Sequence, residues 1–120
     1  MKNFRDLLVW RKAHSLTLDC YRVTNAFPKR ITSQIRRCSA SIAANIAEGC
    51  GKRGNAEFQR FLGIAGGSAS ELDYHFLLAH DLGLLVINDY ERLNSGMVEV
   101  KRMLASLIQK VQGERLRTEC

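Results

Sequence analysis

Hydrophobic side chains recur with helical spacing along four segments of the chain. The sharpest pattern is a seam with steps of four, three, four and four residues: Ile31, Ile35, Cys38, Ile42 and Ile46. Such spacing places its members on one face of a helix. A less regular stripe precedes it: Leu7, Trp10, Ala13, Leu18, Tyr21 and Val23. No segment alternates like a strand, and we predict helices over about residues 5–27, 31–48, 55–82 and 89–112.

Local signals mark the ends of these helices. Pro28 follows the first one, and the residue before a proline avoids the α region. Gly49 is predicted to end the second helix in a left-handed conformation, and Asn55 to cap the third. Residues 88–91 read N-D-Y-E, which has capping-box spacing with Asn in the place of Ser or Thr. All connections are therefore short.

The third segment contains three glycines in its interior, within GIAGGSAS at residues 63–70. Each costs roughly 1 kcal/mol relative to alanine in a helix. Close helix crossing is the ordinary compensation. We expect these glycines to pack against the small residues of the second segment, which include Ala40, Ala43, Ala44 and Ala47.

Short connections make consecutive helices antiparallel, which predicts an all-α, up-down four-helix bundle spanning residues 1–120 as a single domain. The chain is 46% hydrophobic and 25% charged, as expected for one globular core. No stretch has the length of a membrane span, and the first residues do not resemble a signal peptide. The four cysteines form no C-x-x-C pair, so we expect free thiols in a cytoplasmic protein.

Positive charge is concentrated in the first half of the chain. Residues 1–60 hold twelve Lys and Arg and four Asp and Glu, a net charge of +8; residues 61–120 have a net charge of −2, giving the overall +6. A basic surface favours polyanionic partners. The alternative is a solvated face that only maintains solubility.

Gly49, Gly51 and Gly54 spell G-x-G-x-x-G, the letter pattern of a dinucleotide-binding turn. That turn functions only between a strand and a helix, and here a helix precedes it. We therefore reject a nucleotide site. Lys52 and Arg53 nevertheless lie directly before a helix N-terminus, where backbone N–H groups and the helix dipole favour anions. The turn is either a phosphate contact or a plain solvated corner.

The sequence offers little for catalysis or metal binding. Glu71 and His75 are four residues apart and can meet on a helix, but two ligands make a poor metal site. No arrangement of nucleophile, base and acid can be argued from spacing. We predict no enzyme activity, no catalytic residue, no metal site and no cofactor.

The remaining chemistry is a set of basic side chains around the second helix: Lys29, Arg30, Arg36, Arg37, Lys52, Arg53 and Arg60. They are our candidate nucleic-acid-binding residues. Because they flank both ends of a long helix, they need not form one patch in a monomer. Phe58, Phe61 and Phe76 are expected in the core, which leaves few aromatic rings for base stacking. Contact with the phosphate backbone of RNA or DNA, with little sequence specificity, is the predicted mode.

Three stretches carry a family resemblance: FRDLLVWRKA, SQIRRCSASIAANIAEGCGK and FQRFLGIAGGSASELDYHFLLAHDLGLL. From about Phe4 to Gln112 the chain resembles the four-helix-bundle proteins encoded in intervening sequences of bacterial 23S rRNA genes. That family is similar to the accessory variability proteins of diversity-generating retroelements. The resemblance implies a homopentamer of antiparallel bundles. Its retroelement relatives bind nucleic acid and partner a reverse transcriptase, and the matching basic positions are Arg36, Arg37, Lys52 and Arg60.

Two departures from the family pattern stand out. The connection between Pro28 and Thr32, usually longer and acidic, is short and basic here, and Ala43 replaces the proline of the S-I-P-x-N-I-A-E-G motif. Arg36 and Arg37 can also serve the bundle or a subunit interface by pairing with Glu71 or Asp73. We expect a basic, oligomeric nucleic-acid-binding protein. The alternative is a scaffold that docks an acidic partner, such as a reverse transcriptase.

Overall fold

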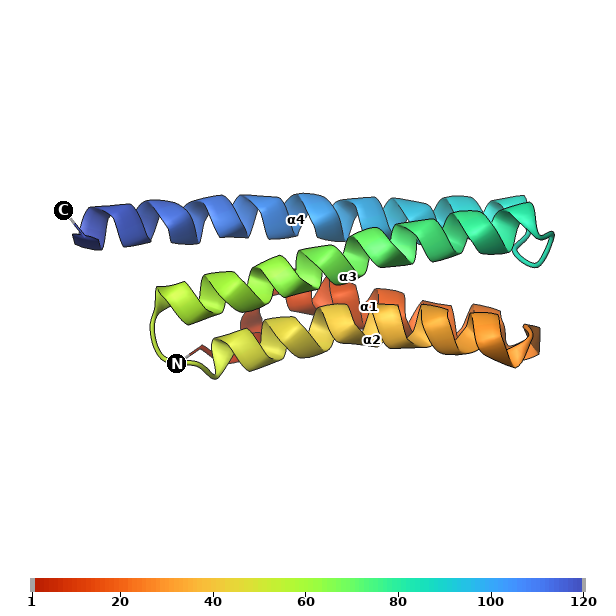
Figure 1. The fold of residues 1–120 in the computed structure, drawn as a ribbon, viewed down its shortest axis with the longest axis horizontal. Helices are drawn as coiled ribbons and strands as arrows, with labels where there is room; N and C mark the ends of the chain where they lie inside the picture. Colours follow the sequence, from red (N-terminus) through yellow and green to blue (C-terminus); the bar gives the residue numbers. More distant parts are fainter. Residues whose placement is uncertain (1, 120) are drawn as a thin grey trace.

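The computed structural model describes residues 2–119, with side-chain surroundings for residues 2–117. Four helices make up this range: α1 (Leu8–Val23), α2 (Lys29–Cys50), α3 (Asn55–Asp81) and α4 (Ile87–Glu119), with 3-10 turns at Phe4–Asp6 and Thr24–Ala26. They run antiparallel in a rod measuring 53 × 21 × 19 Å (Figure 1). No strand occurs among residues 2–119. The predicted all-helical, up-down four-helix bundle is confirmed.

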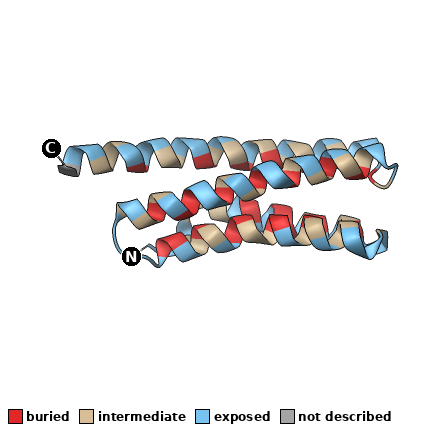
Figure 2. Cartoon of the chain, viewed as in Figure 1, coloured by how far each residue is buried: buried red, intermediate tan, exposed pale blue. Residues whose placement is uncertain are grey.

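The core lies between the inward faces of the helices (Figure 2). Each helix packs on its neighbour in chain order, and α4 returns to contact α1, which closes the bundle. The predicted seam of α2 is central to it: Ile35, Cys38, Ile42 and Ile46 are all buried. Phe58, Phe61 and Phe76 of α3 are buried as expected. No helix within the described residues is both long and apolar enough to cross a bilayer.

The buried stripe of α1 differs from the one predicted. Its buried side chains are Val9, Ala13, Leu16, Thr17 and Cys20. Leu18 and Tyr21, which we expected in the core, are 46% and 44% exposed. The spacing of four, three and four residues from Val9 to Cys20 follows the helix period more closely, and it turns Leu18 and Tyr21 outward. The first predicted helix also ends earlier, since α1 gives way to the 3-10 turn at Thr24.

Gly49 does not end α2, contrary to prediction. The helix continues to Cys50 and is closed by Gly51 at φ −83°, so neither glycine is left-handed. Gly49 is instead buried against α3. A Cβ there would lie 2.9 Å from the Cβ of Phe61 and 3.1 Å from a ring carbon of Phe58. Its missing side chain permits the close approach of the two helices.

The starts of α3 and α4 also differ from prediction: the N-cap of α3 lies one residue earlier than predicted, and α4 begins two residues before the predicted start at residue 89. Gly54, at φ 79°, is the N-cap of α3, and Asn55 is its first helical residue. In α4 the Val86 carbonyl accepts the first helical hydrogen bond, from the Tyr90 N–H at 2.9 Å, so Asn88 lies inside the first turn. The predicted capping roles of both asparagines are therefore wrong. α4 also continues to Glu119, beyond the predicted end near residue 112.

The glycines of GIAGGSAS do not mark a tight crossing. A Cβ added to Gly63, Gly66 or Gly67 meets nothing within 4 Å. Gly63 and Gly67 lie on the outer face of α3, where large apolar side chains are exposed as well: Ile64 at 41%, Tyr74 at 58% and Leu77 at 45%. We call these five residues the outer stripe of α3. The cost of its glycines is not offset by packing within the described chain.

Three cysteines are free and buried: Cys20, Cys38 and Cys50. Burial raises the pKa of Cys20 to about 12 and that of Cys38 to about 11, and it also raises the pKa of Cys50. Protonated, covered thiols are poor nucleophiles. The prediction of free thiols is confirmed for these three positions, while Cys120 lies outside the described residues.

Candidate nucleic-acid interface

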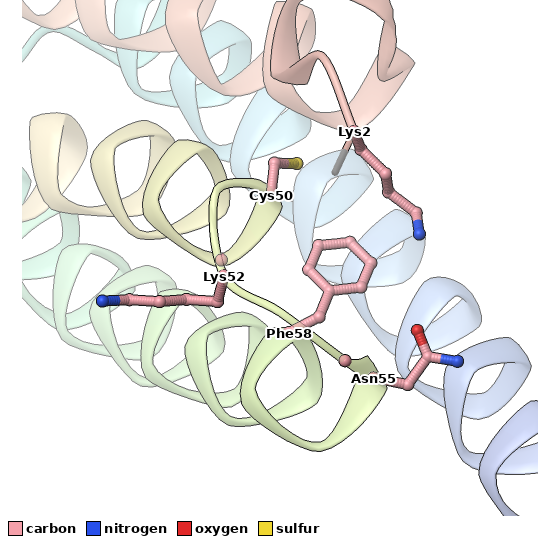
Figure 3. A pocket seen from close by; sticks show the side chains of 7 residues that line it. Lys2, Cys50, Lys52, Asn55 and Phe58 are labelled. Carbon is pink, nitrogen blue, oxygen red and sulfur yellow. The ribbon is translucent and has the colours of Figure 1, made fainter.

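The turn between α2 and α3 lies beside the start of the chain. The Lys2 backbone N–H donates a hydrogen bond to the Cys50 carbonyl at 3.2 Å, which fixes the N-terminal segment at this corner. A cavity of about 310 Å³ opens here, lined by Lys2, Gly49, Cys50, Lys52, Gly54, Asn55 and Phe58. The Lys2 ammonium lies 4.8 Å from the centre of the Phe58 ring, whereas the Lys52 side chain extends the other way (Figure 3).

The N-terminus of α3 forms one wall of this cavity. Gly54 has no side chain with which to cap it, and no side-chain cap hydrogen bond is present. The Asn55 side chain turns away and donates to Oε2 of Glu114 on α4, at 3.2 Å. The first-turn N–H groups of a long helix therefore lack a side-chain acceptor, and the positive end of the helix dipole is at the same place. An anion is the natural complement of such a terminus.

Two further cations lie over the neighbouring ring of Phe61. The Lys52 ammonium is 5.6 Å and the Arg60 guanidinium 4.5 Å from its centre. Arg60 also donates to both carboxylate oxygens of Glu57, at 3.2 Å each. This pair lowers the pKa of Glu57 and raises that of Arg60, so both groups stay ionised, and the carboxylate offsets part of the positive field of Arg60.

Arg53 is exposed in the turn itself. We call Lys2, Lys52, Arg53 and Arg60 the basic corner. Three of the four were predicted from the sequence. The structure brings these three together at one end of the bundle, around the start of α3.

The other predicted basic residues lie elsewhere. Lys29 and Arg30 are exposed at the start of α2, the opposite end of that helix from the basic corner. The seven candidate residues therefore do not form one patch in the monomer. This agrees with the sequence analysis, which placed them at both ends of a long helix.

Arg36 serves the bundle. Its guanidinium donates to Oγ1 of Thr24 at 3.0 Å and to the carbonyl of Tyr21 at 3.1 Å. It also stacks over the Tyr21 ring, 4.5 Å from its centre. These contacts tie α2 to the end of α1. Of the two roles open for Arg36, the structure favours the internal one.

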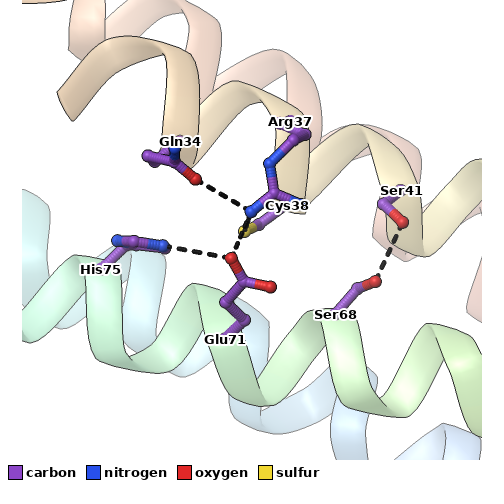
Figure 4. A network of polar contacts seen from close by, with 7 residues as sticks. All are labelled: Gln34, Arg37, Cys38, Ser41, Ser68, Glu71 and His75. Carbon is purple, nitrogen blue, oxygen red and sulfur yellow. Dashed lines mark hydrogen bonds and ion pairs between the residues drawn. The ribbon is translucent and has the colours of Figure 1, made fainter. Parts of the chain in front are cut away.

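Arg37 lies on the seam between α2 and α3 and forms an ion pair with Glu71, one of the partners anticipated for it. The Nη2 atom of Arg37, which makes this ion pair, also donates to Oε1 of Gln34 at 2.9 Å and contacts Sγ of Cys38 at 3.4 Å. Both members of the ion pair are about half exposed. A nearby hydrogen bond joins Ser41 of α2 to Ser68 of α3 at 2.9 Å (Figure 4).

The sequence analysis did not predict two basic residues that lie near the basic corner. Lys2 joins the basic corner only because the chain start folds back along the end of α2. Arg115 of α4 donates to Oε1 of Gln59 of α3 at 2.6 Å, which places it near the same end. No local sequence signal predicts either position, since both depend on which segments meet in space.

Comparison with known proteins places the chain in a family. Residues 5–106 match the model of the 23S rRNA-intervening sequence protein family. The chain belongs to this family. It is also similar to a crystal structure of a protein of unknown function from the S23 ribosomal protein family of Bacteroides thetaiotaomicron VPI-5482, with 27% sequence identity and a TM-score of 0.78. The similarity covers 84% of this chain and 98% of the other.

No curated protein matches the chain. The family match confirms the resemblance to 23S rRNA-intervening sequence proteins that the sequence indicated. The likeness of this family to retroelement accessory proteins stays a prediction.

Proposed function

We propose that this family member is a non-enzymatic protein that binds RNA or DNA through the phosphate backbone, with the basic corner as its main contact. The observation that carries the proposal is the start of α3, which lacks a side-chain cap and opens into the cavity beside Lys2, while the Lys52 side chain extends from the other side of the same turn (Figure 3). Backbone N–H groups, a helix dipole and cationic side chains together suit a phosphate group. The exposed Arg53 adds a further cation to the same turn.

Backbone contact explains low sequence specificity. Phe58 and Phe61, the rings nearest the basic corner, are 3% and 7% exposed and have cations over them. They offer no free face on which a base can stack. Recognition therefore depends on charge and on the shape of the nucleic acid. The family description refers to an rRNA intervening sequence, which makes structured RNA the first ligand to try.

We also propose that the chain assembles as a homo-oligomer, with the homopentamer of the resemblance as the expected state. The outer stripe of α3 supports this proposal, because its glycines leave room for the backbone of a second copy to approach beside Ile64 and Tyr74. Light scattering coupled to size-exclusion chromatography measures the assembly mass. Replacing Tyr74 by Glu should reduce that mass, and a monomeric wild-type protein would contradict the proposal.

Fluorescence anisotropy with a labelled structured RNA and a matched DNA duplex, titrated across salt, tests nucleic-acid binding. We expect the logarithm of affinity to fall linearly with the logarithm of salt concentration, with a slope of about 0.9 per phosphate engaged on duplex DNA. An absence of binding at low salt would reject the proposal. The basic corner would then fit the alternative function, docking of an acidic protein such as a reverse transcriptase, which a pull-down detects.

A further inference from the structure

Three side chains with metal-binding chemistry converge between α2 and α3, far from the basic corner. The Sγ atom of Cys38, a carboxylate oxygen of Glu71 and a ring nitrogen of His75 all lie within 4.8 Å of one another. Glu71 and His75 are one turn apart on α3, with Nε2 of His75 3.4 Å from Oε2 of Glu71. Cys38 faces them from α2 (Figure 4). The sequence showed only the two residues on α3; the third ligand comes from the neighbouring helix.

The same place already attracts positive charge. One atom, Nη2 of Arg37, is bonded to Oε2 of Glu71 and Oε1 of Gln34 and contacts Sγ of Cys38. Its bonds show that sulfur and oxygen atoms from two helices point toward a common cation position. Arg37 is 55% exposed and lies at the surface, so its long side chain can turn into solvent without opening the core.

We propose that Cys38, Glu71 and His75 form a binding site for Zn²⁺, which takes the place of the Arg37 guanidinium and links α2 to α3. Thiolate sulfur, imidazole nitrogen and carboxylate oxygen are the three donor types that zinc uses in proteins. Three protein ligands leave one tetrahedral position for water on the exposed side, where Glu71 and Arg37 meet solvent. One sulfur and one nitrogen donor disfavour Mg²⁺ and Ca²⁺, which prefer oxygen.

Binding exchanges protons as well as cations. The thiol of Cys38 is covered by its surroundings and must lose its proton to become a ligand, so each zinc ion bound releases one proton to solvent. The ion bridges two helices that separate on unfolding. Zinc should therefore raise the thermal stability of the native bundle as its concentration rises.

Cobalt substitution tests the site directly. The full-length protein, reduced and stripped of metal, is titrated with Co²⁺ and followed by absorption. We expect a thiolate-to-cobalt charge-transfer band and the visible bands of a tetrahedral centre, at one ion per chain, all removed by added Zn²⁺. Cys38→Ser should abolish the charge-transfer band. His75→Gln should weaken binding more than about tenfold, since loss of outer-shell partners alone costs about that much.

Matched controls come from the same chain. Cys50→Ala and His80→Gln alter a buried thiol and a helix-surface imidazole outside the cluster and should leave the cobalt spectrum unchanged. Arg37→Gln removes the competing cation and should tighten binding. Circular dichroism verifies that each variant is folded. If Cys38→Ser does not fold, His75→Gln alone tests the site. Absence of a charge-transfer band in the wild type, or unweakened binding in folded His75→Gln, would overturn the proposal.

Discussion

Gly49 of α2 and Phe61 of α3 lie so close that a Cβ on Gly49 would be 2.9 Å from the Cβ of Phe61. This contact sets the separation of the two helices just before the turn that carries Lys52 and Arg53. A Cβ atom cannot rotate away from its own backbone. Added volume at Gly49 must therefore be accommodated by moving a helix rather than a side chain.

Gly49→Ala should consequently destabilise the bundle. Alanine gains roughly 1 kcal/mol of helix propensity, but overpacking at a rigid contact costs about 1–3 kcal/mol. We expect a net loss of up to about 2 kcal/mol in the free energy of unfolding, measured by urea denaturation at equilibrium. An unchanged or higher midpoint would show that the helices separate easily here.

Gly67→Ala provides the opposite case. A Cβ at this position meets nothing within 4 Å, and the residue is exposed in a helix interior. We expect the free energy of unfolding to rise by roughly 0.5–1 kcal/mol from helix propensity alone. The same urea titration, at a protein concentration where the mass is that of a monomer, measures it. Lower stability would mean that Gly67 packs against something outside this chain's own bundle.

Arg36→Met should destabilise the fold without changing nucleic-acid affinity. Methionine keeps an unbranched side chain but loses the bonds to Thr24 and to the Tyr21 carbonyl. Hydrogen bonds from charged groups contribute a few kcal/mol at most, and the bonds of Arg36 are partly exposed. We therefore expect the free energy of unfolding to fall by about 1–2 kcal/mol. Thermal unfolding and RNA anisotropy are measured together. Weaker RNA binding at full stability would instead place Arg36 in the interface.

Removal of charge from the basic corner should weaken nucleic-acid binding and flatten its salt dependence. The triple replacement of Lys2, Lys52 and Arg53 by alanine changes three exposed side chains, so the fold should persist. We expect the salt slope on duplex DNA to fall by about 0.9 for each phosphate that the variant no longer neutralises. Lys29→Ala with Arg30→Ala is the control at the other end of α2. An equal effect of both variants would mean that charge counts and position does not.

The buried thiols predict how stability depends on pH. The pKa of Cys20 is about 12 in the folded state, against an ordinary value of 9.0. Above about pH 9 the unfolded chain loses a proton that the folded chain keeps, so rising pH favours unfolding until the folded pKa is passed. Each such thiol lowers the free energy of unfolding by up to about 1.4 kcal/mol for each unit that the pH rises in this range. Urea denaturation from pH 8 to 10.5 measures the slope, which Cys20→Ala should reduce; an identical slope would contradict the assignment.

Periodicity predicted the helices well where one face is buried all along its length. The seam from Ile35 to Ile46 was predicted because every third or fourth residue is apolar and nothing competes with it. In α1, two stripes share the helix, and propensity cannot tell which one faces the core. Leu18 and Tyr21 were therefore misassigned, although the helix itself was predicted correctly.

Glycines were harder to interpret because their role depends on what surrounds them. Gly49 has the same letter as a helix-ending glycine, yet it remains helical beneath Phe61. Gly63 and Gly67 were predicted to allow a close helix crossing, but they face outward. A glycine reports only that no side chain is present. The neighbour that makes this necessary belongs to another helix.

The class of fold, the antiparallel order of the helices and the basic character of the turn at Lys52 and Arg53 could be predicted from the residues alone, because these features follow from local spacing and short connections. Tertiary structure alone decided which distant residues meet. It placed Lys2 beside Cys50 and engaged Arg36 with the end of α1. It also brought Cys38 to Glu71 and His75. These pairings depend on the rotation and separation of packed helices, which no spacing along a single helix contains.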